Sequence, residues 1–179
     1  MHRKKLYNPH KAWYDNNGIH TALKTEDESM IALACDHGGI DLKDAAIEVL
    51  NELGLEYKDF GTDSHESCDY PVYGARAAKA VASGECEKGI ILCGTGVGIG
   101  IAANKVKGIR CVICTDTFSA RMSRLHNNAN MIALGSRVLG SELAKELLRV
   151  WLTTDFSYDE RHIRRVDMIM DIEAGKEIE

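Results

Sequence analysis

The sequence predicts an α/β fold: a single doubly wound domain with a five-stranded parallel sheet and helices on both faces. From residue 30 to the end of the chain, short aliphatic and β-branched runs alternate with longer stretches whose apolar residues recur at helical spacing. In addition, the chain has 179 residues, of which 45% are hydrophobic, enough for one domain with a substantial core. Alternating strands and helices of this kind form parallel sheets with right-handed crossovers.

The expected elements follow one another in a regular order. Five segments have the composition of strands: 31–36, 55–60, 89–93, 109–114 and 130–135. Six helical stretches lie between and after them: 41–54, 73–84, 98–106, 116–127, 141–153 and roughly 158–174. In the first of these, Ala46, Val49 and Leu50 lie on one apolar face, which Gly54 ends. This order is typical of Rossmann-like and flavodoxin-like folds.

Residues 1–29 differ from the rest of the chain. They are polar, rich in Asn and His, and show no sustained periodicity. We expect a loosely ordered N-terminal extension without a chemical role, joined to one domain that spans residues 30–179.

Composition and charge exclude several classes of partner. The net charge is −5 and the basic residues are scattered, which is not the pattern of a nucleic-acid-binding protein. No apolar run is long enough to span a bilayer, and the N-terminus lacks the apolar core of a signal peptide. We therefore expect a cytoplasmic protein that binds neither nucleic acid nor a membrane.

The six cysteines lie mostly inside strand-like runs, which favours reduced, buried thiols over a disulfide framework. Cys111 and Cys114 have the C-x-x-C spacing of some metal sites. However, residues three apart on a strand face opposite sides of the sheet. Core packing is therefore the favoured interpretation, and no metal site is expected.

Functional residues of such a fold are expected directly after the strands, because ligands bind beyond the carboxyl ends of parallel strands. Here those positions are 36–37, 61–62, 93–98, 115–116 and 135–137. The most distinctive is CGTGVGIG at 93–100, where glycine takes every second position. This segment fits none of three known motifs: the dinucleotide G-x-G-x-x-G loop, the P-loop and the C-x5-R phosphatase loop.

The amides of Gly94, Gly96 and Gly98 precede a predicted helix and are expected to form a concave anion site. The alternative is a tight turn in which glycine only permits close packing. Cys93, beside these amides, is expected to form its thiolate more readily than a free cysteine, and the same donors would stabilise an oxyanion. This combination suggests attack on a carbonyl or proton abstraction beside one, with an inert core thiol as the alternative.

Asp36 and His37 follow the first strand and are expected near the Cys93 loop if the two strands are neighbours. The alternative for Asp36 is a helix N-cap. His126 and Asn127 end a helix, where a histidine commonly interacts only with the helix dipole.

Arg161 and Arg165 lie four residues apart and so project from one face of the last helix. Two guanidinium groups on one face suit a phosphate, which accepts forked, charge-assisted hydrogen bonds. The alternative is a solvated surface on which Asp159, Glu160 and Asp167 are the partners.

The candidate groups lie in five segments whose order and spacing resemble the ribose-5-phosphate isomerase B family: CDHGG, DYPVYG, GIILCGTGVGIGIAANKVKGIR, SRLHNNANMIALGSRV and RHIRRVD. The resemblance runs from about Met30 to the C-terminus and excludes the extension. It implies an enzyme that interconverts ribose 5-phosphate and ribulose 5-phosphate without metal or cofactor. It also implies a homodimer or homotetramer whose active site lies at the subunit interface.

By this resemblance, Cys93 is the base that moves a proton between C1 and C2 of the sugar, and His126, with Asp36 beside it, assists ring opening. Other matching residues hold the enediolate oxygens (Gly94, Thr95, Gly96, Val97 and Gly98), contact the substrate (Asn127) or bind the phosphate (His37, Arg137, Arg161 and Arg165). One branch of the family uses a glutamate base after the glycine loop. Residues 99–101 contain no acid, which indicates the cysteine branch.

Two alternatives stay open. The same residues would serve an isomerase of a six-carbon sugar phosphate, such as allose 6-phosphate or galactose 6-phosphate. A non-catalytic sugar-phosphate sensor would need the anion loop and the arginines, but not Cys93 and His126 together.

Overall fold

A computed structural model describes residues 30–178, and the prediction for residues 1–29 lies outside this range. The five described strands form one parallel sheet in the order β2-β1-β3-β5-β4. Their bounds are β1 (Ile31–Cys35), β2 (Tyr57–Asp59), β3 (Lys88–Cys93), β4 (Cys111–Ile113) and β5 (Met131–Gly135). The predicted sheet is confirmed; β2 and β4, at its edges, are shorter than expected. Relative to the flavodoxin order, the last two strands are exchanged.

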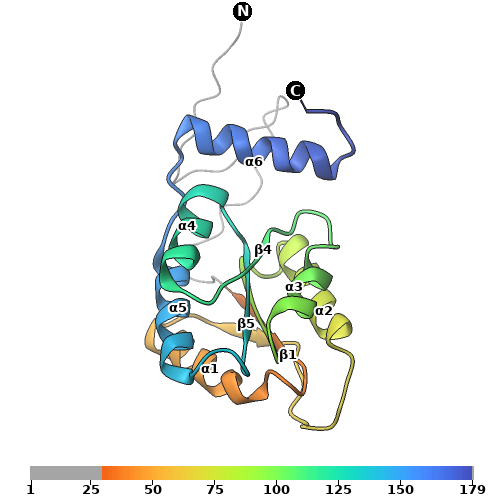
Figure 1. Cartoon of the computed structure of the whole chain (residues 1–179), viewed down its shortest axis with the longest axis vertical. Helices are drawn as coiled ribbons and strands as arrows, with labels where there is room; N and C mark the ends of the chain where they lie inside the picture. The colour runs from red at the N-terminus through yellow and green to blue at the C-terminus, as the bar shows by residue number, and fades with distance from the viewer. Residues whose placement is uncertain (1–29, 179) are drawn as a thin grey trace, which may run out of the picture.

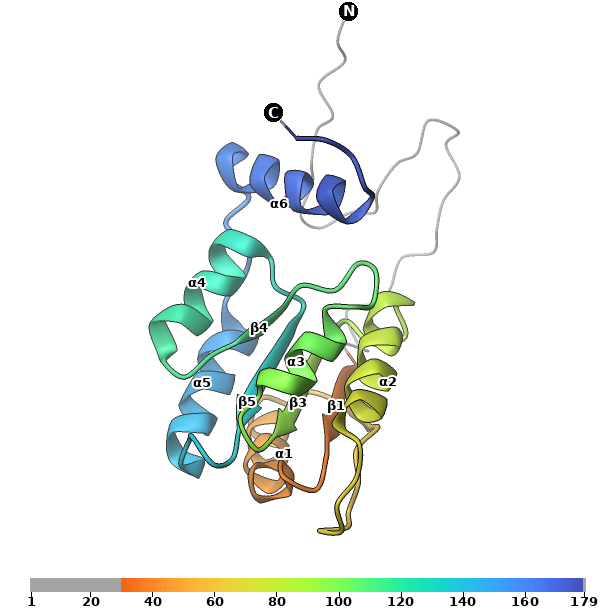
Figure 2. The same cartoon turned by 45° about the vertical axis from the view of Figure 1, so that its right-hand side comes forward.

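The helices cover both faces of the sheet, as Figures 1 and 2 show. Their bounds are η1 (Ile40–Leu42, a 3-10 turn), α1 (Lys43–Glu52), α2 (Tyr70–Ala82), α3 (Val97–Ala103), α4 (Thr117–Asn127), α5 (Ser141–Thr153) and α6 (Glu160–Glu173). The described helix α2 begins three residues before its predicted start. Pro71 lies in its first turn, a position where the ring suits the helix and no N–H partner is needed.

Two hydrophobic cores lie on opposite faces of the sheet. One packs α1, α4 and α5 against large strand residues such as Leu33, Leu92 and Leu134. The other packs α2 and α3 against the alternate, often smaller residues of the same strands. Cys111 belongs to the second core and Cys114 to the first, so the two thiols face opposite sides as predicted.

These buried thiols are poor nucleophiles at neutral pH. Burial raises the pKa of Cys111 to about 12 and that of Cys114 to about 11. Among residues 30–178, no three His, Cys, Asp or Glu side chains are grouped so that they could hold a metal ion.

Helix α6 lies apart from the two layers, across one end of the molecule and next to the C-terminal end of α4 (Figures 1 and 2). His162 is its one buried residue. Ile169 and Ile172 are 41% and 55% exposed, so part of the apolar surface of this helix is not covered within the chain. No helix in the described part of the chain is long and apolar enough to cross a membrane.

Candidate active site

The site begins where the order of the strands reverses. From β1 the chain proceeds to β2 on one side and then to β3 on the other, so β1 and β3 are neighbours at the switch point. The backbone N–H of Asp36 donates to the carbonyl of Leu92 at 3.2 Å, which continues the pairing past the end of β1. The loops after these two strands therefore start side by side, as the sequence analysis required.

The loops after β1, β3 and β5 touch backbone to backbone. A Cβ on Gly39 would overlap the Leu92 carbonyl group, and a Cβ on Gly135 would lie 2.5 Å from the backbone of Thr95. Any side chain at these two positions would push the loops apart. Glycine here serves close approach, which brings the ends of three strands into one small region.

Cys93 is the last residue of β3, and only 5% of it is exposed. Its Sγ accepts a hydrogen bond from the backbone N–H of Gly96 at 3.1 Å. Gly96 is in the left-handed region, with φ 76°, directly before α3, and this conformation turns its N–H back toward the sulfur. This bond holds the Cys93 sulfur against the backbone of the loop that precedes α3.

The other backbone N–H groups of the glycine loop do not all point to one place, as the regular glycine spacing had suggested. The N–H of Val97 donates to the Oγ1 of its neighbour Thr95 at 3.3 Å, and Gly98 is already inside α3. Thr95 itself is exposed at the tip of the loop. The loop therefore offers the Thr95 hydroxyl and backbone amides on one side of Cys93.

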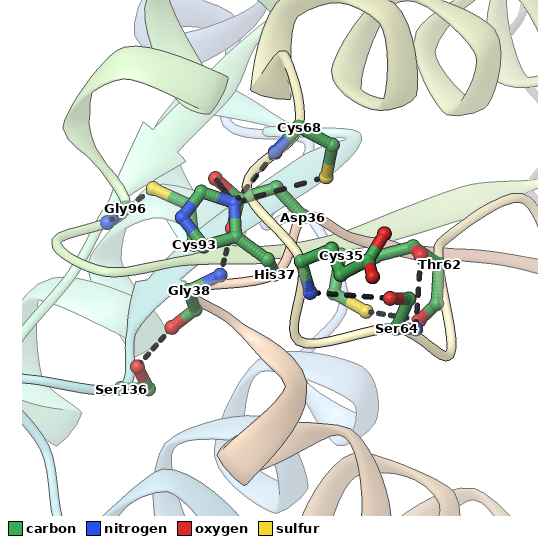
Figure 3. Close-up of polar contacts among 11 residues, drawn as sticks. Cys35, Asp36, His37, Gly38, Thr62, Ser64, Cys68, Cys93, Gly96 and Ser136 are labelled. Atoms are coloured by element: carbon green, nitrogen blue, oxygen red, sulfur yellow. Dashed lines mark hydrogen bonds and ion pairs between the residues drawn. The ribbon is translucent and has the colours of Figure 1, made fainter.

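Asp36 and His37 lie beside this loop at the end of β1 (Figure 3). Asp36 is buried, and its Oδ1 accepts the N–H of Gly38 at 2.9 Å. The N-cap of the following 3-10 turn is Gly39, so Asp36 shapes the loop and is not the helix cap of the alternative interpretation. The other carboxylate oxygen lies 3.9 Å from His37 Nδ1.

The ring of His37 is oriented by a second loop. The backbone N–H of Cys68 donates to His37 Nδ1 at 3.1 Å, and the Cys68 sulfur lies 3.7 Å from the same nitrogen (Figure 3). Because Nδ1 accepts this bond, Nε2 carries the proton of the neutral ring. In this tautomer His37 presents Nε2–H as a hydrogen-bond donor.

The buried Lys43 side chain anchors the loop that contains Cys68. Lys43 donates to Asp59 at 2.6 Å, to Asp63 at 2.5 Å and to the carbonyl of Thr62 at 3.3 Å. Burial alone would lower the pKa of Lys43, but its hydrogen bonds to the two carboxylates outweigh burial and raise it. Lys43 thus stays charged and ties the loop to α1.

Arg137 belongs to the same edge of the sheet. Its N–H donates to the carbonyl of Gly94 at 2.9 Å, and its guanidinium lies against Gly94, since a Cβ there would be 3.3 Å from Nε. The preceding Ser136 hydroxyl donates to the carbonyl of Gly38 (Figure 3). Arg137 is exposed. Of the three arginines predicted to bind phosphate, it is the one that lies near Cys93.

The remaining predicted residues form a second group at the opposite end of the molecule. Helix α4 starts at the carboxyl end of β4 and ends with His126 and Asn127, directly before the amino end of β5. Its 11 residues span about 16 Å. Arg161 and Arg165, on the exposed side of α6, lie near this end of α4 and not near the Cys93 loop.

One chain therefore does not assemble the complete set of predicted residues. Asp36 and His126, expected side by side, lie at opposite ends of the parallel strands: Asp36 follows the carboxyl end of β1, and His126 precedes the amino end of β5. The phosphate-binding set is divided in the same way. The first group contains Cys93, Asp36, His37, the loop 94–98 and Arg137. The second contains His126, Asn127, Arg161 and Arg165.

The structure also adds residues that the sequence analysis did not single out. The Tyr70 ring lies against Gly98, where a Cβ would be 2.7 Å from the ring. Arg110 donates to the carbonyl of Asn128 at 2.8 Å and contacts the sulfur of Met170 at 3.4 Å, which links the end of α4 to α6. The DYPVYG segment, which spans the start of α2, contained a signal for Tyr70. Nothing local marks Arg110, because its partners are 18 and 60 residues away.

Comparison with known proteins identifies the family of this chain. Residues 31–169 match the sequence model of the ribose/galactose isomerase family. The chain belongs to this family. The resemblance inferred from its motifs is thereby confirmed.

The chain is similar to several proteins of the ribose/galactose isomerase family over most of their length. Ribose-5-phosphate isomerase B of Escherichia coli is 50% identical over 146 residues, which cover 82% of this chain and 97% of that protein. D-erythrulose-4-phosphate isomerase of Pectobacterium atrosepticum is 46% identical over 127 residues, covering 70% and 84%. The solved structure of Clostridium thermocellum ribose-5-phosphate isomerase B superposes with a TM-score of 0.79 at 50% identity, covering 82% and 98%.

Proposed function

We propose that this protein is a sugar-phosphate isomerase that interconverts ribose 5-phosphate and ribulose 5-phosphate, with Cys93 as the base. The observation that carries the proposal is the position of the Cys93 sulfur, which ends a central strand, accepts the Gly96 N–H and lies next to the Asp36 loop. An aldose–ketose isomerisation needs one base at carbon and N–H donors for the enediolate. The 50% identity to ribose-5-phosphate isomerase B supports the substrate.

The proposed reaction is a proton transfer between adjacent carbons. The Cys93 thiolate removes the proton from C2 of the open-chain aldose, and the electrons of that bond form the C1–C2 double bond of a cis-enediolate. Negative charge develops on O1, where loop amides and the Thr95 hydroxyl stabilise it. The O2 hydroxyl proton then moves to O1, and the Cys93 thiol returns its proton to C1 to give the ketose.

The remaining residues of the proposed site have two functions, ring opening and phosphate binding. His126, with Asp36, assists opening of the furanose ring before the transfer, and Asn127 contacts the sugar. His37, Arg137, Arg161 and Arg165 bind the phosphate, which holds the reacting carbons at the Cys93 sulfur.

Because one chain divides these residues between its two ends, we propose a homodimer or homotetramer with shared sites. The Cys93 edge of one subunit would face the α4–α6 end of another. Exposed apolar side chains around the Cys93 edge support this arrangement, with Phe118 72% exposed and Val138 and Ile101 both 54% exposed. Exposed large apolar side chains are common at protein interfaces.

The substrate is the first thing to test. Metal-free protein is incubated separately with the 5-phosphate of ribose, the 6-phosphates of allose and galactose, and erythrose 4-phosphate, and kcat/KM is compared. We expect ribose 5-phosphate to give the highest value. A six-carbon substrate is the second candidate, since the description of the family includes galactose. Flat progress curves with all four would reject an isomerase and favour a sensor.

The base is tested with Cys93→Ala and Cys93→Ser. Loss of a positioned base lowers kcat by about 10²–10⁴-fold, while binding of the sugar phosphate should change little. Cys114→Ala is the matched control, because it removes a buried thiol that lies directly after β4, which is separated from β3 by β5 in the sheet. Wild-type kcat in Cys93→Ala would refute the assignment of the base.

A further inference from the structure

His126 is packed against a second imidazole. The ring centroids of His126 and His162 are 4.3 Å apart, with an angle of 36° between the planes. His162 lies in the first turn of α6 and is 3% exposed, whereas His126 is only half-buried at the end of α4. The inner ring is therefore the fixed partner, and the outer ring is the one that solvent or a ligand can reach.

The inner ring is held from the linker that joins α5 to α6. The Ser157 hydroxyl lies 2.7 Å from His162 Nδ1, and the backbone N–H of Ser157 donates to the carbonyl of Leu125 at 3.1 Å. This second bond ties the linker to the last turn of α4, directly before His126. The position of His162 is thus defined relative to the helix that carries His126.

The charges around His162 favour its neutral form. Burial lowers the pKa of His162, and the positive charges of His126, Arg161 and Arg165 lower it further, while Asp159, 3.7 Å from Nδ1, opposes them. A neutral inner ring does not repel a positive charge on His126. It therefore supports the outer ring whether or not that ring carries an extra proton.

On the basis of the proposed function, we propose that His162 is a positioning residue that holds the His126 imidazole for ring opening. Opening of the furanose removes the proton of the C1 hydroxyl, breaks the bond between C1 and the ring oxygen O4, and places a proton on O4. An acid–base group at the end of a helix needs a defined ring orientation for these transfers. The packing against His162 supplies it.

This role separates two steps of the reaction. Ring opening needs His126, whereas the transfer between C1 and C2 needs Cys93. Ribulose 5-phosphate has no free C5 hydroxyl with which to close a ring on C2, so it reaches Cys93 already open. Exchange of its C1 hydrogen with solvent deuterium therefore reports the Cys93 step alone.

The test compares His162→Asn, which removes the ring, with His162→Phe, which keeps an aromatic surface. We expect His162→Asn to lower kcat for ribose 5-phosphate about tenfold with KM nearly unchanged, and His162→Phe to recover at least about threefold. Deuterium exchange into ribulose 5-phosphate should stay near the wild-type rate in both. Met170→Leu is the control, because it alters another contact of α6 with the body of the protein.

Several results would overturn the inference. One is a wild-type kcat in His162→Asn. Another is a rate of deuterium exchange that falls by the same factor as kcat, because a variant that is merely misfolded loses both activities. If the proton on Cys93 does not exchange with solvent even in the wild-type protein, a second measurement is used instead of deuterium exchange. This is the kinetic isotope effect on kcat with ribose 5-phosphate deuterated at C2. Slow ring opening drives that effect toward one, and an unchanged effect contradicts the role of His162. Failure of the proposed function is a different result: the wild-type protein itself would convert no sugar phosphate.

Discussion

Cys93 lies directly opposite Gly135 in the parallel pairing of β3 with β5. The pairing continues past both strands, because the N–H of Ser136 donates to the carbonyl of Cys93 at 2.9 Å. Gly135 is also packed against the backbone of Thr95, in the loop that follows Cys93. A single small residue on the neighbouring strand thus determines how closely the loop after Cys93 can approach the sheet.

Gly135→Ala should therefore destabilise the protein and displace the loop. A Cβ at 2.5 Å from the Thr95 backbone cannot be accommodated by a change of side-chain rotamer, and we expect a loss of about 1–3 kcal/mol in the free energy of unfolding. Urea denaturation measures it. Gly140→Ala is the matched control, since its Cβ would meet no atom within 4 Å. Equal stabilities for the two variants would contradict the tight approach.

The exposed arginines of α6 should act on substrate affinity. If Arg161 and Arg165 bind the phosphate, replacing either with Ala removes charge-assisted hydrogen bonds made equally in the ground and transition states. We expect KM for ribose 5-phosphate to rise about 10–100-fold with little change in kcat. Steady-state kinetics measure both constants, and Arg164→Ala, on the same helix and also exposed, is the control. An unchanged KM would show that these arginines are ordinary surface residues.

Mixed oligomers should reveal whether sites are shared between subunits. If the proposed roles hold, Cys93→Ala and His126→Asn should each abolish turnover of ribose 5-phosphate. A dimer containing one subunit of each would still have one site with both residues intact. After unfolding and refolding together, an equal mixture should recover about one quarter of wild-type activity, because half the dimers are mixed and each has one complete site. The measured quantity is activity against mixing ratio. A mixture no more active than its components would place the complete site within one subunit.

The stability of the protein should fall in mild acid partly because of His162. Its pKa is lowered in the folded state, so below about 6.5 the unfolded chain binds a proton that the folded chain resists. The contribution of His162 to the free energy of unfolding is therefore constant above this pH. It decreases as the pH falls toward the pKa of His162 in the folded state. In His162→Phe this contribution is absent, so Tm should decrease less between pH 7 and about pH 5. Parallel Tm curves for the variant and the wild type would contradict the lowered pKa.

Much of the fold was predictable because its signals are local. Alternating patterns placed every strand and helix of residues 30–178 close to its observed bounds, and the end of α4 at Asn127 was predicted to the residue. The start of α2 was placed late, because its first turn contains Pro71, whose effect depends on position within the helix. The role of Asp36 as a helix cap was considered and does not hold, since Gly39 is the N-cap of the 3-10 turn that follows.

The candidate site was predictable only in part. The motifs named its residues, and the neighbouring positions of Asp36 and Cys93 followed once β1 and β3 were adjacent. The contacts of His37 with Cys68 and of His126 with His162 join residues 31 and 36 positions apart. A periodic pattern over a few residues does not indicate contacts between residues so far apart in the sequence.

By itself the sequence determined an alternating parallel α/β domain and its membership of an isomerase family, because periodicity and motif spacing are local properties of the chain. Only the tertiary structure decided which strands are neighbours and that α4 carries His126 away from Cys93 to the far end of the sheet. Strand order depends on how whole layers pack, and a helix of fixed rise separates the residues at its two ends. For this reason the residues of one reaction lie in two groups on one chain.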